Sequence, residues 1–412
     1  MLRGHGKILF GIIVLVGLLA IAPRVQAEGE WILKDQRAKL QENGLSFKVV
    51  SLEDYVSVLS GGISHKDTWN GLLDFGINYD LGKAGFVPGG SIFFRGAEIH
   101  GGQLPSGDLV GDAQGVDDYE ANHTFRVWEA GYKQSLMNDK LSLKAGILDL
   151  DSDLAFSDLA SGLFLNSAFS LTPTITNNID VSLYPITTLG VLAKFSFSDN
   201  FTLQAGVYDG SPIASEQNHH NLNIKLSKSG GLLSVVEGAY GYKLPVTSEG
   251  LAGTFKLGAW YDSKAFDDVV NVDENEDPVK HGGDFGGYFT LDQKIWCEKD
   301  DQGLSAFLIG GAAPKDRNAI ERHLGAGLVY TGLIPSRDAD QLGVAFTNAY
   351  FSHKAYMANG TQRSETTIET SYQWKVNDSL SFEPDFQYVY NPGGDASIKN
   401  ASVFMLRTKI TY

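Results

Sequence analysis

The chain has 412 residues and a formal net charge of −16, and 43% of its residues are hydrophobic. This acidity argues against nucleic acid and anionic membrane surfaces as partners. Cys297 is the single cysteine, so no intramolecular disulfide is available and a packed core or a closed sheet must hold the fold.

Residues 1–27 are typical of a secretory signal peptide. Arg3 and Lys7 give a positive start, the run 8–22 is apolar or glycine, and 25–27 form a small-x-small cleavage site. The alternative is a transmembrane anchor, but the apolar run is shorter than the roughly 17 to 25 residues that span a bilayer. We therefore expect cleavage after Ala27 and export of the remaining chain.

Residues 28–44 hold the one clear helix candidate. Leu33, Arg37 and Leu40 recur at helical spacing, and Asn43 with Gly44 is a stop signal. We expect a short N-terminal helix on the periplasmic side, ahead of a different kind of structure.

After Gly44 the hydrophobic period changes to two, which is typical of β-strands. Alternating segments with turn residues between them occur at 141–147, 185–197, 201–207, 231–242, 251–261, 282–296, 305–311, 324–330, 342–351, 366–374, 380–390 and 402–412. Over the whole chain the count is 16 or 17, depending on whether 221–226 stands alone. Bacterial single-chain barrels have even strand numbers, so we predict an all-β fold: a 16-stranded antiparallel transmembrane β-barrel over 45–412.

The connections differ in length in the way that outer-membrane barrels require. Those at 138–139, 198–200 and 376–378 read as tight turns, whereas 101–119 and 266–281 are long, polar and acidic. Short turns at one end and long loops at the other favour a barrel over the alternative, a soluble protein built of several sandwiches.

The last strand ends on an aromatic residue. Phe404, Leu406, Ile410 and Tyr412 share one face, while the other face becomes polar toward Lys409. An apolar-out, polar-in closing strand is typical of outer-membrane barrels, and we expect it to pair with the first strand near 45–58.

Several segments, in order, are similar to one family. They are Trp31 with 37–47, then 126–136, 140–151, 163–167, Tyr184 with Pro185, 327–337 with Asp340 and Gly343, Glu369 with Tyr372, and 384–393. In these the chain resembles the carbohydrate-selective porins, the OprB family. The resemblance implies a 16-stranded barrel whose narrow, charged pore passes small sugars. It departs from the pattern at Gly131, where the family usually has a bulky residue, and at Tyr412, where Phe is commoner.

Charged residues inside alternating strands must face the lumen, because a lipid-facing charge near the midplane costs about 2–4 kcal/mol. Sugars are recognised by charged hydrogen-bond partners and by aromatic surfaces. We expect Arg95, Arg126 and Lys144 to be donors at the constriction and Trp128 to be a stacking surface. The alternative is that each is only a wall residue solvated by lumenal water.

The same parity places further pore-lining side chains: Lys256, Glu369, Glu383, Asp385 and Arg407, with Lys375, Gln387 and Lys409. Glu129 has the opposite parity unless a bulge intervenes.

The segment 149–169 is too irregular for a spanning strand. Asp149, Asp151, Asp153 and Asp158 make it acidic, and it is a candidate constriction loop folded into the barrel, with an outer surface loop as the alternative. The segment lacks the glycine and the distal Glu of an EF-hand loop, so we expect neither a metal nor a cofactor.

The predicted function is passive, substrate-preferring diffusion of small carbohydrates across the outer membrane of a Gram-negative bacterium. The alternative is a general or cation-selective diffusion porin, because the acidic charge would favour cations if it lines the pore. The sequence contains no Gly-x-Ser-x-Gly and no His-Glu-x-x-His motif, so an enzyme is not expected. Expected partners are small sugars as solutes, outer-membrane lipid and lipopolysaccharide, and a homo-oligomer is compatible with this class.

Overall fold

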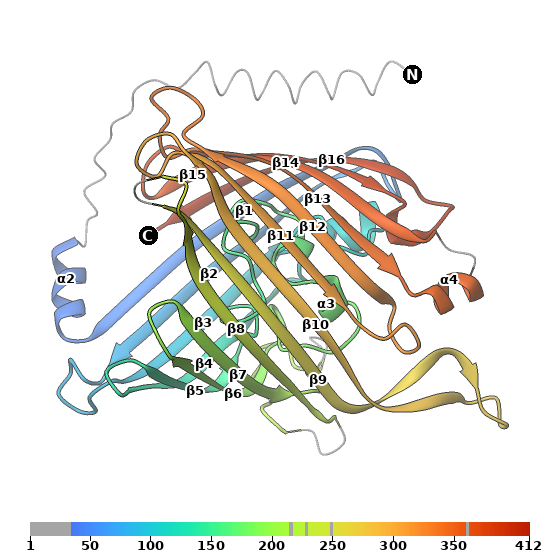
Figure 1. The fold of residues 1–412 in the computed structure, drawn as a ribbon, viewed down its shortest axis with the longest axis horizontal. Helices are drawn as coiled ribbons and strands as arrows, with labels where there is room; N and C mark the ends of the chain where they lie inside the picture. Colours follow the sequence, from blue (N-terminus) through green and yellow to red (C-terminus); the bar gives the residue numbers. More distant parts are fainter. Residues whose placement is uncertain (1–33, 214–216, 227–229, 248–249, 360–361) are drawn as a thin grey trace.

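In a computed structural model, residues 34–412 are described, apart from 214–216, 227–229, 248–249 and 360–361. Sixteen antiparallel strands, each paired with its neighbours in sequence, close into one barrel (Figure 1). This confirms the predicted fold class. The strands are β1 (Leu45–Gly62), β2 (Asp67–Asp80), β3 (Gly90–Gly101), β4 (Thr124–Leu136), β5 (Leu141–Leu148), β6 (Thr188–Ser196), β7 (Phe201–Asp209), β8 (Leu232–Leu244), β9 (Leu251–Val272), β10 (Pro278–Cys297), β11 (Gly303–Ala312), β12 (Ile320–Thr331), β13 (Gln341–Phe351), β14 (Ser364–Lys375), β15 (Leu380–Tyr390) and β16 (Lys399–Thr411).

The first and last strands close the sheet as the sequence predicts. β1 pairs with β16 from Val50 opposite Thr411 to Val58 opposite Val403. Val56, Val403 and Met405 are fully buried on the inner face. Closure removes every free sheet edge, so each backbone polar group of the wall can be paired within the sheet.

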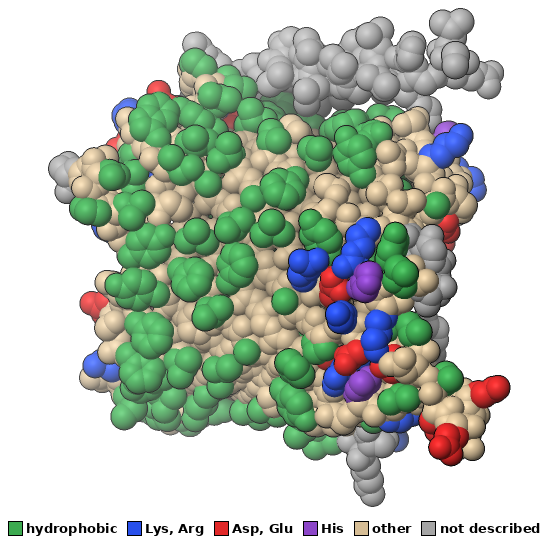
Figure 2. Space-filling view, turned by 45° about the vertical axis from the view of Figure 1, so that its right-hand side comes forward, with side chains coloured by type: hydrophobic (Ala, Val, Ile, Leu, Met, Phe, Trp, Pro, Cys, Tyr) green, Lys and Arg blue, Asp and Glu red, His purple; other side chains and the backbone are tan. Residues whose placement is uncertain are grey.

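The outer wall is apolar. Large side chains such as Val191, Leu257, Phe285, Leu328 and Val344 are about half exposed because they point away from the lumen. Figure 2 shows green side chains covering most of the wall, with charged groups gathered toward one end. Such a band is what a barrel presents to lipid tails. No helix in the described part of the chain is long and apolar enough to cross a membrane.

The N-terminal helix is present as α2 (Lys34–Glu42), and the predicted stop at Asn43 and Gly44 follows it directly, with a φ of 87° at Gly44. It lies at the end of the barrel where β16 also ends (Figure 1). The predicted signal peptide lies outside the described residues and stays a prediction.

One sequence expectation about strands needs correction, and the open question of the strand count is decided as predicted. Residues 266–281 are not a loop: β9 and β10 continue past the barrel rim as a long hairpin that turns at 273–277 (Figure 1). Beyond the membrane a hairpin no longer needs an apolar face, so its alternation disappears while its backbone pairing continues. Residues 221–226 form no strand, and this decides the count at 16.

Two long connections fold into the barrel interior. Loop A (102–123) joins β3 to β4, and loop B (149–187) joins β5 to β6. Val110 and Val116 of loop A cluster with Leu165 of loop B and with inner residues of β1 and β16. Phe164 and Phe169 of loop B pack on Phe307 of β11, with ring centroids 5.5 and 5.7 Å from it. Burying each such ring stabilises by about 1.5–3 kcal/mol, so these loops are parts of the core.

Candidate pore constriction

Arg95 occupies the centre of the site. It projects inward from β3, and its guanidinium makes two hydrogen bonds of 2.9 Å to the carboxylate of Asp74 on β2. The guanidinium carbon lies 3.4 Å from the centre of the Trp128 ring, a stacked cation–π arrangement. Its Nη1 also lies 3.5 Å from the hydroxyl of Ser152 in loop B. Arg95 is therefore held rigidly from the wall while it reaches the loop that crosses the lumen.

A β-bulge in β4 builds the wall beside Arg95. Arg95 pairs with Glu129 but the next residue, Gly96, pairs with Val127, so Trp128 is the extra residue. Trp128 and Glu129 are both buried on the inner side, at 4% and 7% exposure. The bulge left open by the parity argument is present, and it turns Glu129 inward.

Lys144 ties loop B to the wall. Its Nζ lies 2.8 Å from Glu129 of β4 and 2.8 Å from Asp153 of loop B. Phe93 lies against the same ammonium, which is 5.0 Å from the ring centre. Arg95 and Lys144 are thus brought together on either side of Glu129, at 3.8 and 2.8 Å, while their role at a constriction stays a prediction.

Carboxyl groups of loop B face the same region. Trp128 donates its indole N–H to Asp149 at 2.5 Å, and Ser170 donates to Asp151 at 3.1 Å. Burial raises the pKa of both carboxyls, and their mutual repulsion raises that of Asp149 further. The loop is consequently anchored by hydrogen bonds as well as by charge.

Two cavities meet at this point. The outer one, about 470 Å³, lies among loops A and B, and the inner one, about 970 Å³, opens toward the end that carries α2. Arg95 and Ser152 line both cavities. The two cavities therefore adjoin where Arg95 approaches Ser152 of loop B.

Aromatic side chains surround the outer cavity. Tyr184 lies between Trp128 and Tyr119, with ring centroids 4.7 and 5.7 Å away, and Phe156 lines the same space. Parity arguments from strands could not find Tyr119, Phe156 and Tyr184, because all three are in loops. Tyr184 does stand in one of the family-like segments, which was its only sequence signal.

The close packing around position 131 explains why this residue is a glycine. A Cβ there would lie 2.2 Å from the carbonyl oxygen of Ala145 and 2.8 Å from the Phe93 ring. The bulky side chain usual in the family does not fit this part of the wall.

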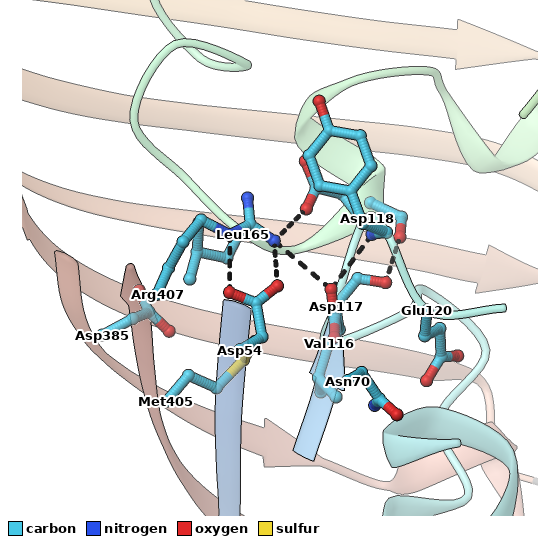
Figure 3. A network of polar contacts seen from close by, with 12 residues as sticks. Asp54, Asn70, Val116, Asp117, Asp118, Glu120, Leu165, Asp385, Met405 and Arg407 are labelled. Carbon is cyan, nitrogen blue, oxygen red and sulfur yellow. Dashed lines mark hydrogen bonds and ion pairs between the residues drawn. The ribbon is translucent and has the colours of Figure 1, made fainter. Parts of the chain in front are cut away.

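Arg407 faces inward from β16, which is the third strand from β3 around the barrel by way of β2 and β1. Its guanidinium contacts Asp54 of β1 at 2.7 and 2.8 Å, and Asp118 and Asp117 of loop A at 2.6 and 3.3 Å (Figure 3). Arg407 is only 6% exposed, so here it fastens loop A over the barrel seam.

The remaining predicted residues also face inward. Glu369 accepts backbone N–H groups of Leu165 and Asn166 at 2.6 and 3.3 Å, and so holds loop B against β14. Lys256 donates to the Phe156 carbonyl at 2.9 Å and lies 3.6 Å from Asp158. Three further side chains are at most 6% exposed: Arg126, Glu383 and Asp385. Glu369 and Lys256 therefore contact loop B, whereas Glu383 and Asp385 bind side chains of neighbouring strand residues.

A closed barrel with an apolar outer wall, a polar interior and loops folded into its lumen defines an outer-membrane porin. Residues 64–412 match the family described as carbohydrate-selective porin, OprB family, so the chain belongs to that family. It is a sugar porin of the Gram-negative outer membrane, which confirms the resemblance, the function and the location expected from the sequence.

Individual relatives are distant but cover nearly the full length. The chain is 25% identical to Porin B of Pseudomonas aeruginosa, over 93% of this chain and 91% of that protein. It is 23% identical to the putative porin QuiX of Acinetobacter baylyi, over 93% of both. The high-pH structure of Pseudomonas putida OprB superposes with a TM-score of 0.82 at 22% identity, over 92% of this chain and 97% of that one, which supports the fold.

Proposed function

We propose that small carbohydrates cross this porin passively, through the outer cavity, past Arg95 and Ser152, and into the inner cavity. The observation that carries the proposal is that these two side chains line both cavities. Arg95 offers oriented N–H donors to sugar hydroxyls, while Trp128 and Tyr184 offer aromatic faces to sugar C–H groups. Binding at such a point is weak enough for the solute to leave.

The orientation follows from the two ends. The end with α2 and the shorter turns faces the periplasm, and the end from which loops A and B enter faces outward. On this proposal outer-membrane lipid and lipopolysaccharide surround the apolar wall. The protein acts as a channel and needs no catalytic group.

Liposome swelling tests the route. We expect Arg95→Ala to change the glucose rate severalfold relative to a polar solute of equal size. Arg322→Ala is the matched control, because the Arg322 side chain is 59% exposed and lies outside both cavities. Equal rates for all solutes of one size in the wild type would contradict sugar preference.

The acidic lining of the outer cavity favours a second candidate, a cation-selective pore. Asp117, Asp118, Glu120 and Asp151 all line this cavity. Reversal potentials in a salt gradient separate the candidates, since a cation-selective pore gives a large potential of fixed sign.

A further inference from the structure

Lysines gather on the wall of the inner cavity, below Arg95. Lys133, Lys144 and Lys194 project inward from the neighbouring strands β4, β5 and β6. Lys133 and Lys144 are directly opposite each other in the register, and Lys194 lies opposite Ser142, two residues along β5 from Lys144. Like charges directly opposite each other destabilise a sheet, so this arrangement does not serve stability.

The carboxylates near these lysines are already engaged. Asp74 binds Arg95, and Glu129 and Asp153 both bind Lys144. In the described part of the chain, no ion pair joins Lys133, Lys194 or Lys48 of β1 to a carboxylate, although all three line the cavity. The inner cavity therefore carries positive charge that its own carboxylates do not pair, with Asp139 as the one further acid in its lining.

The outer cavity has the opposite sign. Four carboxylates line it, from Asp117, Asp118, Glu120 and Asp151, and Arg95 at its floor is the only Lys or Arg among its described lining residues. Arg407 lies behind Asp117 and Asp118 and offsets part of this charge (Figure 3). The sign of the wall thus changes at Arg95, where the two cavities meet.

We propose that these two oppositely charged cavities, which act as an outer and an inner vestibule in series, exclude small ions of both signs while uncharged carbohydrates pass. The proposal rests on the function proposed above and deepens it. An anion is repelled in the acidic outer vestibule and a cation in the basic inner one, whereas a neutral sugar meets neither barrier. The Debye length is about 8 Å at physiological ionic strength, so the charged walls act across spaces of this size.

Planar-bilayer recordings of the purified protein in KCl at pH 8, above the pKa of about 7 to which burial raises Glu120, test the proposal. In 0.1 M KCl we expect a current that rectifies, differing about twofold between opposite voltages, and rectification should vanish in 1 M KCl, where the Debye length falls to about 3 Å. The triple variant Lys48→Glu, Lys133→Glu, Lys194→Glu makes both vestibules acidic. We expect it to lose rectification and to become cation-selective, with potassium permeability raised about fivefold or more over chloride.

Lys280→Glu with Lys299→Glu is the control pair, because both lysines are exposed and lie outside the two cavities. Heat-dependent migration on gels verifies that every variant is a folded barrel. A linear current in the wild type at low salt, or a triple variant with unchanged reversal potential, would overturn the proposal. Liposome swelling with glucose is run beside it: loss of sugar preference in the wild type refutes the sugar route, while the ion recordings still decide the charge arrangement.

Discussion

Arg407 and Asp54 lie directly opposite each other across the seam that closes the barrel, and their side chains form two hydrogen bonds there. The same guanidinium also contacts Asp117 and Asp118 of loop A. One cation thus joins the first strand, the last strand and a loop in the lumen. Closure of the sheet and narrowing of the pore are coupled through this residue.

Arg407→Met should destabilise the protein strongly. The side chains of Arg407 and Asp54 are only 7% and 4% exposed, so removing the cation leaves buried carboxylates without their counter-charge. We expect the free energy of unfolding to fall by about 3–5 kcal/mol, measured by urea titration of the refolded protein. Arg322→Met is the control and should cost less than about 1 kcal/mol, because the Arg322 side chain is 59% exposed and Glu321 keeps its ion pair with Arg363. Equal losses in the two variants would contradict a special role for the seam.

Lys144→Met should loosen loop B. The Lys144 ammonium bridges Glu129 and Asp153, and its ion pair with Asp153 joins β5 to the start of loop B. We expect a larger and noisier single-channel conductance. Asp153→Asn should produce a similar change, and the double variant should show little further increase because both substitutions break one contact.

Lys140→Met serves as the control, since Lys140 is exposed in the turn before β5. Fully additive effects of the Lys144 and Asp153 substitutions would show that this ion pair does not hold the loop.

Strand alternation explains how much of this could be predicted from the sequence. Arg95, Lys144 and Arg407 were placed on the inner face because the alternation of apolar side chains along their strands fixes their parity. Glu129 could not be placed, because a bulge depends on the pairing with β3 and leaves no local signal. Tyr119, Phe156 and Tyr184 belong to loops, whose path through the lumen depends on contacts with distant strands such as that of Leu165 with Glu369. The partial burial of the inner charges follows from those same contacts.

The seating of loop A should depend on pH through Glu120. Burial, together with Asp112 and Asp108, raises the pKa of Glu120 to about 7, while the pKa of a free glutamic acid is about 4.5. The folded loop therefore holds a proton that the unseated loop releases, and its stability is greatest below the free value and falls as pH rises through about 7. We expect single-channel noise to increase between pH 5.5 and pH 8, because Glu120 loses its proton over this range.

Glu120→Gln should remove most of this dependence, because an amide keeps the neutral form at every pH. Asp378→Asn, in an exposed turn at the opposite end of the barrel, is the control and should leave the pH profile unchanged. A pH profile that survives in Glu120→Gln would assign the titration to another carboxyl, for example Asp112, whose pKa burial raises to about 6.

The Tyr184 ring should set the preference for sugars over other polar solutes. It packs 4.7 Å from Trp128 and 5.7 Å from Tyr119, and its hydroxyl donates to the Tyr119 carbonyl at 3.2 Å. Tyr184→Ala removes an aromatic face from the outer cavity without changing charge, so the swelling rate with glucose should fall severalfold relative to a polar solute of equal size, as expected from the loss of a stacking contact of about 0.5–1.5 kcal/mol. Tyr184→Phe retains the ring and should stay near the wild-type ratio. If Tyr184→Phe lost the preference while Tyr184→Ala lost no more, the hydroxyl and its hold on loop A would be the important feature, and the stacking surface would not.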